Sequence, residues 1–327
     1  MGEFELIRRH FARGQTGPSV ALGIGDDCAL LRPSPGLQLA ISSDMLVEGR
    51  HFFPDVDPAA LGHKSLAVNL SDLAAMGARP LGFTLALSLP AADDAWLKAF
   101  ADGLHALADA HACPLVGGDT TRGPLNICIT VFGEVAPERA LRRDAAKAGD
   151  DLWLSGCTGE ARLALERLRG TPWATVATGD EALCRQRLER PTPRLALGMA
   201  LAGLAHAAID LSDGLAGDLG HILAASGVGA EIDRAALPVA PALQALSETH
   251  RLECLLQGGD DYELLFTAPQ DVRQAVLAAA EISGTPVHRI GRITADRGLR
   301  LLGADGLPKD LRARSWDHFA PGSDPVS

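Results

Sequence analysis

The segment 58–76 most constrains the fold, because it predicts a long helix that is apolar over most of its surface. Apolar and small side chains recur there at spacings of three and four residues, namely Leu61, Ser65, Leu66, Leu70, Leu73 and Met76. Asp72 stands among them, although aspartate is unfavourable in a helix interior. A buried carboxylate is costly unless it is paired or bound to a metal ion. Two interpretations stay open: Asp72 binds a cation, or it lies on an exposed edge or caps a local break in the helix.

Further aspartates sit beside glycines or hydroxyl side chains where apolar runs end, in Gly25-Asp26-Asp27, Ser42-Ser43-Asp44, Gly117-Gly118-Asp119, Asp210-Leu211-Ser212-Asp213 and Gly258-Gly259-Asp260-Asp261. Any one of these motifs is typical of a turn or a helix cap; Asp213, for example, could simply begin a helix capped by Ser212. Together they favour a site, because strand ends and loops are where functional sites are commonly assembled.

Converging aspartates would require cations. Two carboxylates about 5 Å apart repel each other by about 3 kcal/mol at an effective dielectric constant near 20. Ligand sets made only of oxygen select hard ions, and Mg²⁺ typically links carboxylates to substrate phosphates. Neither GxxxxGK[ST] nor a complete GxGxxG occurs, and none of the four lysines, Lys64, Lys98, Lys147 and Lys309, lies in a glycine-rich loop. Metal ions, arginines and backbone amides are therefore expected to supply the positive charge for any bound phosphate.

The length and charge of the chain limit its class. A chain of 327 residues predicts two domains, and a net charge of −11 argues against nucleic-acid and anionic-membrane partners. The six cysteines form no CxxC pair, which is typical of reduced thiols in a cytosolic protein. The N-terminus lacks the pattern of a signal peptide, and no apolar run approaches the roughly 18 residues that span a bilayer. The expected location is the cytoplasm.

Strand and helix patterns alternate without a regular βαβ rhythm, which favours an α+β fold in two domains. Strands are predicted at 37–43, ending before Asp44, at 82–89, at 115–116 before the Gly117-Gly118-Asp119 motif, at 125–132, and within 290–311. Helices are predicted after a cap at Asp93, at 193–206, and after Gly214, where Leu215, Leu219, Ile222 and Leu223 share a face.

Six motifs occur in a characteristic order: GIGDDCALL (23–31), ISSDMLVEGRHF (41–52), KSLAVNLSDLAAMGARP (64–80), GGDTTRGP (117–124), IDLSDGL (209–215) and GGDDYEL (258–264). Together with RSWDHF (314–319), they resemble the thiamine-monophosphate kinase family of the aminoimidazole-ribonucleotide-synthetase-like superfamily. The resemblance spans essentially the whole chain.

This resemblance implies two αβ domains of the aminoimidazole-ribonucleotide-synthetase-like type. The N-terminal domain, 1–140, would bind metal and ATP and pair its sheet with a second copy in a homodimer. The C-terminal domain, 141–327, would close over the site. The implied reaction converts ATP and thiamine monophosphate into ADP and thiamine diphosphate.

The resemblance also implies roles for individual residues. Several Mg²⁺ ions would be bound by Asp27, Ser42, Ser43, Asp44, Asp72, Asp119, Asp210 and Asp213. ATP would be bound by Gly118, Asp119, Arg143 and Ser212. Thiamine monophosphate would be bound by His51, Asp260 and Trp316. The catalytic residues are expected to be Asp27, Asp72 and Asp119. Asp260 departs from the family pattern, which usually has a glutamate there, so the charge is kept and the reach is one methylene shorter.

Some alternatives remain open from the residues alone. His51 by itself is more typical of a hydrogen-bonded structural histidine than of a ligand, and Trp316 is equally typical of an anchor for the C-terminal tail. The acceptor oxygen of a phosphate is already ionised, so we expect direct in-line transfer without a strong general base. Another ATP-using synthetase of the superfamily, or a non-catalytic metal and nucleotide sensor, would share the acidic motifs. Selenophosphate synthetase is disfavoured, because a reactive Cys and Lys near the N-terminus are expected there and the first lysine here is Lys64.

Overall fold

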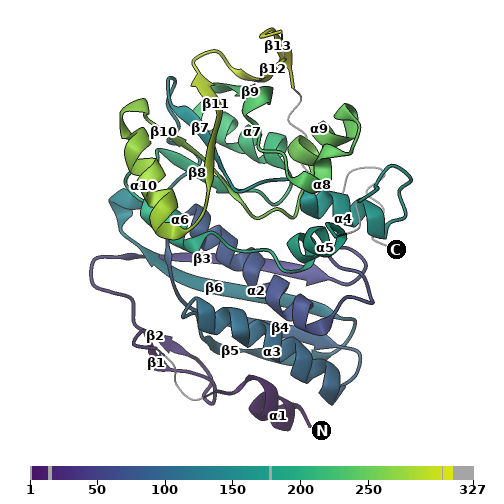
Figure 1. Ribbon diagram of the computed structural model, residues 1–327. Coiled ribbons are helices and arrows are strands. Elements are labelled where there is room, and N and C mark those ends of the chain that lie inside the picture. The colour runs from purple at the N-terminus through teal and green to yellow at the C-terminus, as the bar shows by residue number, and fades with distance from the viewer. Residues whose placement is uncertain (1, 14–16, 177–178, 304, 312–327) are drawn as a thin grey trace. The chain divides into compact units, whose positions relative to one another are not determined.

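The computed structural model describes residues 2–13, 17–176, 179–303 and 305–311 (Figure 1). The chain forms two compact units. The first comprises residues up to Leu73 together with Ala78–Pro137, and the second comprises Ala74–Gly77 and the described residues from Glu138 onward. Each unit combines helices with a mainly antiparallel sheet, so the predicted α+β class is confirmed.

The first unit is built on a four-stranded sheet in the order β3-β6-β4-β5, in which only β4 and β5 run parallel. Its elements are α1 (Glu3–Leu6), the π-helical turn η1 (Ile7–Phe11), β1 (Val20–Leu22), β2 (Leu30–Leu31), β3 (Gln38–Val47), α2 (Pro58–Ala75), β4 (Arg79–Leu89), α3 (Asp94–Ala110), β5 (Leu115–Arg122) and β6 (Asn126–Val135). The short η2 (Pro137–Arg139) follows β6.

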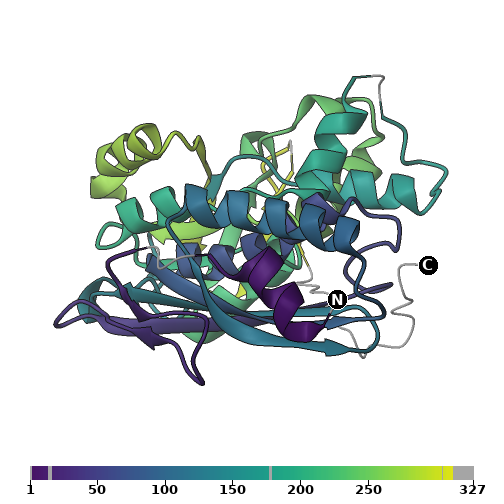
Figure 2. The same ribbon diagram turned by 90° about the horizontal axis from the view of Figure 1, so that it is seen from below.

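Helices α2 and α3 cover one face of this sheet (Figures 1 and 2). They approach each other closely because each presents a glycine to the backbone of the other. A Cβ atom at Gly62 would lie 2.1 Å from the carbonyl oxygen of Phe100, and one at Gly103 would lie 1.9 Å from that of Ala59. The predicted cap of α3 is confirmed, since the Asp93 carboxylate accepts the amides of Ala95 and Trp96.

All four strands of this sheet extend beyond their predicted ranges, and the extensions of β3 and β5 change where the acidic motifs lie. β3 does not end before Asp44, because its pairing with β6 continues to Val47. β5 does not end at Val116 but runs through the Gly117-Gly118-Asp119 motif to Arg122, paired with β4. The prediction that these aspartates follow strands was wrong: both lie inside strands, since cross-strand hydrogen bonding continues where the local apolar pattern stops.

The second unit contains a seven-stranded sheet in the order β13-β12-β9-β11-β7-β10-β8. Its strands are β7 (Asp151–Ser155), β8 (Ala207–Asp210), β9 (Gly229–Asp233), β10 (Leu264–Ala268), β11 (Val287–Thr294), β12 (Gly298–Leu302) and β13 (Pro308–Asp310). Its α-helices are α4 (Glu160–Leu168), α5 (Glu181–Glu189), α6 (Leu195–Leu201), α7 (Leu215–Ser226), α8 (Pro241–Gln244), α9 (Glu248–Gln257) and α10 (Arg273–Ser283), with short 3₁₀ turns η3 (Arg234–Ala236) and η4 (Gln270–Val272).

The helix predicted after Gly214 is confirmed as α7, whose Leu215, Leu219 and Ile222 are fully buried. The helix predicted at 193–206 is shorter, because Ala202 is extended and ends α6 at Leu201. The short strands predicted in the C-terminal part are confirmed as β11, β12 and β13. Among the described residues, no helix combines the length and apolar character that crossing a membrane requires.

Candidate functional site

In the first unit, β3 and α2 hold four polar residues together, which we call the β3–α2 cluster: Ser42, Asp44, Asn69 and Asp72. The hydroxyl of Ser42 donates to Oδ2 of Asp72 at 2.5 Å. The backbone amide of Asp44 donates to Oδ1 of Asn69 at 3.1 Å. Asp72 lies inside α2 and is partly buried, so it neither caps a break in the helix nor sits on a fully exposed edge. The cluster brings three of the predicted metal ligands to one place.

Asn69 is the member of this cluster that sequence reasoning missed. Its side chain is completely buried, and its Nδ2 donates to the carbonyl oxygen of Ser65, one turn earlier in α2. Oδ1 is thereby turned toward β3, where it fixes the backbone of Asp44. The available signal was a second polar residue three positions before Asp72 in an apolar helix, since such positions share a helix face.

Ser43, also predicted to bind metal, points to the opposite face of β3 from Ser42, as alternation along a strand requires. Its hydroxyl lies 2.9 Å from Oγ1 of Thr130 and donates to the carbonyl oxygen of Ile129 at 3.2 Å. The structure therefore separates Ser43 from Asp72.

Asp119 lies on β5, at the other edge of the four-stranded sheet from β3. The strand register puts Asp119 in the row of Ala86, Cys128 and Met45, next to the row that contains Asp44. Three strand spacings of roughly 4.8 Å put the backbones of Asp119 and Asp44 about 14 Å apart. Two carboxylates at this separation cannot share one Mg²⁺ ion within a single chain, because Mg–O bonds are only about 2.1 Å long.

Gly118 precedes Asp119 and has a backbone that only glycine adopts readily, with φ at +147°. A Cβ atom at Gly118 would lie 1.9 Å from the carbonyl oxygen of Leu85 on β4. The second glycine of the Gly117-Gly118-Asp119 motif is thus required for β5 to approach β4.

Asp27 and His51 lie elsewhere in the first unit. Asp27 is exposed in a loop, and its amide donates to Oδ1 of Asp26 at 2.8 Å. His51 follows β3, and its Nδ1 accepts the amide of Val47 at 3.0 Å. That bond closes the turn and leaves the ring proton on Nε2. His51 therefore has a structural role in the fold.

In the second unit, two motifs far apart in the sequence lie side by side, and we call them the β8–β10 turn cluster: Asp210, Ser212, Asp213 and Asp260. The amide of Asp260 donates to the carbonyl oxygen of Ser212 at 2.9 Å. The amide of Tyr262 likewise donates to the carbonyl oxygen of Leu211 at 2.8 Å, which continues the pairing of β8 with β10. A Cβ atom at Gly259 would lie 2.3 Å from the Ser212 carbonyl oxygen, so the second motif needs its glycine there.

The backbone around Asp260 is strained. Asp260 and Tyr262 both have positive φ angles, +66° and +50°, which are uncommon for residues other than glycine. The hydroxyl of Tyr262 donates to Oδ1 of Asp260 at 3.3 Å. The surrounding pairing holds this turn in place, and strained turns of this kind are concentrated at functional sites.

Two further carboxylates that sequence reasoning did not assign lie beside this cluster. Burial raises the pKa of Asp218 to about 7, although the amides of Asp213 and Gly214 and the charge of Arg143 oppose the shift. Burial also raises the pKa of Asp261 well above its usual value, against the amide of Gly159, which donates to Oδ1 at 2.9 Å. The sequence spacing of Asp218 from Asp213, which precedes α7, gave no indication that the two residues are in contact.

Arg143 is exposed in the segment between η2 and β7, and its carbonyl oxygen accepts the hydroxyl of Ser226. Trp316, predicted to contact substrate, lies outside the described residues. Across the described residues, no three His, Cys, Asp or Glu side chains are gathered closely enough to hold a metal ion by themselves. The clusters do present only oxygen donors, which is the chemistry that suits Mg²⁺.

Comparison with known proteins identifies the relatives of this chain. The family model of the AIR synthase related protein, N-terminal domain, matches residues 25–135, and that of the C-terminal domain matches residues 154–303. The thiamine-monophosphate kinase of Escherichia coli (strain K12) is 48% identical over 322 residues, which cover 98% of each chain. The crystal structure of thiamine-monophosphate kinase from Stenotrophomonas maltophilia K279a is similar with a TM-score of 0.82 and 50% identity, over 88% of this chain and 92% of that chain. A solved complex of AaThiL with AMPPCP and TMP is similar with a TM-score of 0.77 and 30% identity, over 88% and 89% of the two chains.

Proposed function

Because the chain belongs to the AIR synthase related family and, within it, to the thiamine-monophosphate kinases, we propose that its two acidic clusters bind Mg²⁺ together with ATP. The activity itself is the ATP-dependent phosphorylation of thiamine monophosphate to thiamine diphosphate. This activity takes the place of the two alternatives that the residues alone left open, another synthetase of the superfamily and a non-catalytic sensor.

The observation that carries the magnesium proposal is the β3–α2 cluster. Asp72 stands partly buried in an otherwise apolar helix, and the Ser42 hydroxyl points at its carboxylate. Mg²⁺ commonly uses one or two carboxylates and completes its shell with water and substrate phosphates. The Ser42 hydroxyl and the Asp72 carboxylate are too few ligands to hold an ion by themselves. They fit a site in which water and substrate phosphates complete the shell. We assign Asp27, Ser42, Ser43, Asp44, Asp72, Asp119, Asp210 and Asp213 to the ions, as the resemblance implies.

Mg²⁺, when bound, would neutralise charge on the phosphates of both substrates. The chain's own contribution is to bind and orient the reactants. Arg143, Ser212 and the Gly118-Asp119 backbone would bind ATP, and His51, Asp260 and Trp316 would bind thiamine monophosphate. The attacking phosphate oxygen is already ionised, so no side chain needs to remove a proton. Positioning for in-line attack and electrostatic stabilisation then account for the catalysis, with Asp27, Asp72 and Asp119 as its principal residues.

We further propose that the active form is a homodimer made through the sheet of the first unit. Large apolar side chains on the face of β3 away from the helices are exposed: Leu39 by 49%, Ile41 by 59% and Met45 by 52%. A second copy would cover this face. A dimer would also resolve the separation of about 14 Å between Asp44 and Asp119, because the β5 edge of one copy can meet the β3 edge of the other. The six free thiols, all within the described residues, support a reducing cytoplasm as its location.

The test is a single-turnover transfer from γ-labelled ATP to thiamine monophosphate, with and without Mg²⁺. Label is expected in thiamine diphosphate only when Mg²⁺ is present, with inversion at a chirally labelled γ-phosphorus. Retention of configuration would indicate a phosphorylated enzyme and overturn direct transfer. Equal turnover after exhaustive chelation would overturn the metal assignment while leaving the kinase activity in place.

A further inference from the structure

Helix α7 connects two segments to which the proposed function gives roles. It begins directly after Asp213 and Gly214, and it ends at Ser226, which contacts the segment that carries Arg143. Each end of the helix bears one polar side chain that bonds the backbone of the neighbouring segment. Neither side chain is assigned to substrate or metal.

At the first end, the Asp218 carboxylate holds the turn that follows β8. Oδ2 of Asp218 accepts the backbone amides of both Asp213 and Gly214, each at 3.1 Å. Asp218 is only 3% exposed, so water does not compete for these bonds. Gly214 has φ at +113°, and a Cβ atom there would lie 2.9 Å from the backbone of Gln257. The turn is thus confined on one side by packing and on the other by Asp218.

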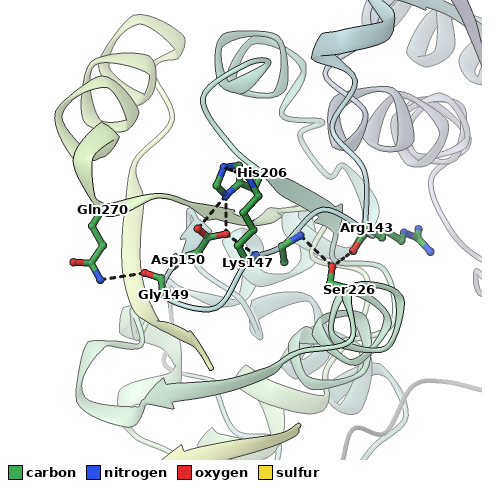
Figure 3. A network of polar contacts seen from close by, with 8 residues as sticks. Arg143, Lys147, Gly149, Asp150, His206, Ser226 and Gln270 are labelled. Carbon is green, nitrogen blue, oxygen red and sulfur yellow. Dashed lines mark hydrogen bonds and ion pairs between the residues drawn. The ribbon is translucent and has the colours of Figure 1, made fainter. Parts of the chain in front are cut away.

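At the other end, Ser226 holds the backbone near Arg143 (Figure 3). Its hydroxyl donates to the carbonyl oxygen of Arg143 at 2.8 Å and accepts the amide of Ala146 at 3.1 Å. One hydroxyl therefore bridges two backbone groups three residues apart. This contact fixes where the Arg143 side chain leaves the backbone, while the guanidinium itself stays exposed.

The rest of the same segment is anchored separately (Figure 3). Asp150 is buried, accepts the amide of Lys147 at 2.9 Å and contacts Nδ1 of His206. The side-chain amide of Gln270 donates to the carbonyl oxygen of Gly149 at 3.1 Å. These contacts secure the end next to β7, so loss of the Ser226 contact would release mainly the Arg143 end.

We propose that Asp218 and Ser226 are positioning residues for the phosphoryl transfer, with Asp218 aligning the metal ligand Asp213 and Ser226 aligning Arg143 toward ATP. This inference rests on the proposed function of Asp213 and Arg143. The competing interpretation is that both side chains merely cap α7. Both interpretations predict lower stability after substitution, but only positioning predicts kinetic effects that depend on Asp213 and Arg143.

The first test replaces Ser226, which is only half-buried, so the fold is expected to persist. Ser226→Ala should raise the KM for ATP about five- to tenfold with kcat within about twofold, because two modest hydrogen bonds are lost. Ser226→Thr, which keeps the hydroxyl, should restore most of the affinity. The matched control is Ser283→Ala. Ser283 ends α10 before Gly284, as Ser226 ends α7 before Gly227, but its hydroxyl donates within its own helix, to the carbonyl oxygen of Ala280. Its kinetics should stay unchanged.

The second test replaces Asp218 with Asn, which keeps the shape but puts an NH2 group, which cannot accept an amide hydrogen bond, in place of one carboxylate oxygen. The Mg²⁺ concentration for half-maximal activity should rise about tenfold, as is typical when the support of a metal ligand is lost. The matched control is Asp93→Asn, since Asp93 also accepts two amides at a helix start. That variant should keep the wild-type Mg²⁺ dependence, since Asn caps helices about as well as Asp.

The decisive readout is coupling measured by double variants. In an Arg143→Ala background, Ser226→Ala should change the KM for ATP by less than about twofold. In an Asp213→Asn background, Asp218→Asn should change the Mg²⁺ concentration for half-maximal activity by less than about twofold. Full, additive effects in those backgrounds would show that α7 is only capped and would overturn the proposal. If Arg143→Ala and Asp213→Asn themselves left ATP and Mg²⁺ dependence unchanged, the proposed site would fail instead. If Asp218→Asn does not fold, the Ser226 series decides alone.

Discussion

At the scale of single residues, the acidic side chains of this chain differ in what holds them. Asp72 receives a hydroxyl hydrogen bond inside a helix, whereas Asp27 is exposed in a loop. The position of Asp119 depends on its neighbour Gly118, because a side chain at position 118 would keep β5 from approaching the backbone of Leu85. The same residue type thus occupies three environments, and substitution should affect each differently.

Asp72→Asn should lower kcat/KM at least about 100-fold and remove most of the rise in melting temperature that Mg²⁺ and ATP together produce. The reason is that the carboxylate charge is lost while the shape and the Ser42 contact are kept. Steady-state kinetics and thermal unfolding with and without Mg²⁺ check this. The control is Asp102→Asn, an exposed residue on α3 paired with Lys98, which should behave as wild type. Undiminished activity of Asp72→Asn would remove Asp72 from the metal site.

Gly118→Ala should lower the free energy of unfolding by about 3 kcal/mol, because positive φ and backbone overlap act together. Chemical denaturation measures this directly. Gly117→Ala is the matched control, since among the described residues its Cβ atom would meet Thr84 alone, at an ordinary 3.7 Å. Equal stability of the two variants would contradict the assigned role of Gly118.

At the scale of elements, a buried carboxylate ties β6 to its surroundings. Glu134 is 3% exposed, accepts the amide and the hydroxyl of Ser34, and pairs with Arg79 at the start of β4. Burial alone would raise the pKa of Glu134, but the hydrogen bonds from Ser34 and Arg79 outweigh it and hold the pKa below its ordinary value of 4.5. The stabilisation from this group is therefore full above pH 4.5 and is lost as the pH falls through the lowered pKa.

Glu134→Gln should accordingly lower the free energy of unfolding by about 2 kcal/mol at pH 7, because the charge-assisted bonds weaken. The difference from wild type should shrink as the pH falls below 4.5. Denaturant unfolding between pH 3 and pH 7 measures both, with the exposed Glu138→Gln as control. A difference that stays constant across this range would mean that the charge of Glu134 is not what stabilises the strand.

Helix and strand predictions succeeded where local signals are strong and failed where pairing decides. The Asp93 cap and the buried stripe of α7 were readable because both depend on neighbours within one turn. The ends of β3 and β5 were not, because a strand continues as long as its neighbour offers hydrogen bonds. The closeness of Asp260 to Ser212 was likewise hidden, since it arises from pairing between β8 and β10.

At the scale of the whole molecule, the proposed dimer makes a distinct prediction. Asp44→Asn and Asp119→Asn should each be inactive alone. If one site takes Asp44 from one copy and Asp119 from the other, mixing the two variants under subunit exchange should restore about one quarter of wild-type activity. Half of the dimers would then be mixed, and each of these would contain one intact site.

Activity of such mixtures, together with molecular mass in solution, measures this prediction. Asp44→Asn mixed with Asp72→Asn is the control, because both residues belong to one β3–α2 cluster and no intact site can form. Absence of recovery in the first mixture, with subunit exchange verified, would place Asp44 and Asp119 in separate sites or in one chain.

The sequence by itself determined the chemistry of this protein: carboxylates beside glycines and hydroxyls, no P-loop, and motifs in the order of one kinase family. These properties depend on residue type and spacing, which the chain carries locally. Only the tertiary structure decided which residues meet. It turned Ser42 toward Asp72 and Ser43 away, put Asp44 and Asp119 on opposite edges of one sheet, and brought Asn69, Asp218 and Ser226 to the backbones that they hold. The physical reason is that strand register, close backbone approach at glycines and hydrogen bonds over long sequence separations arise only when distant segments pack together.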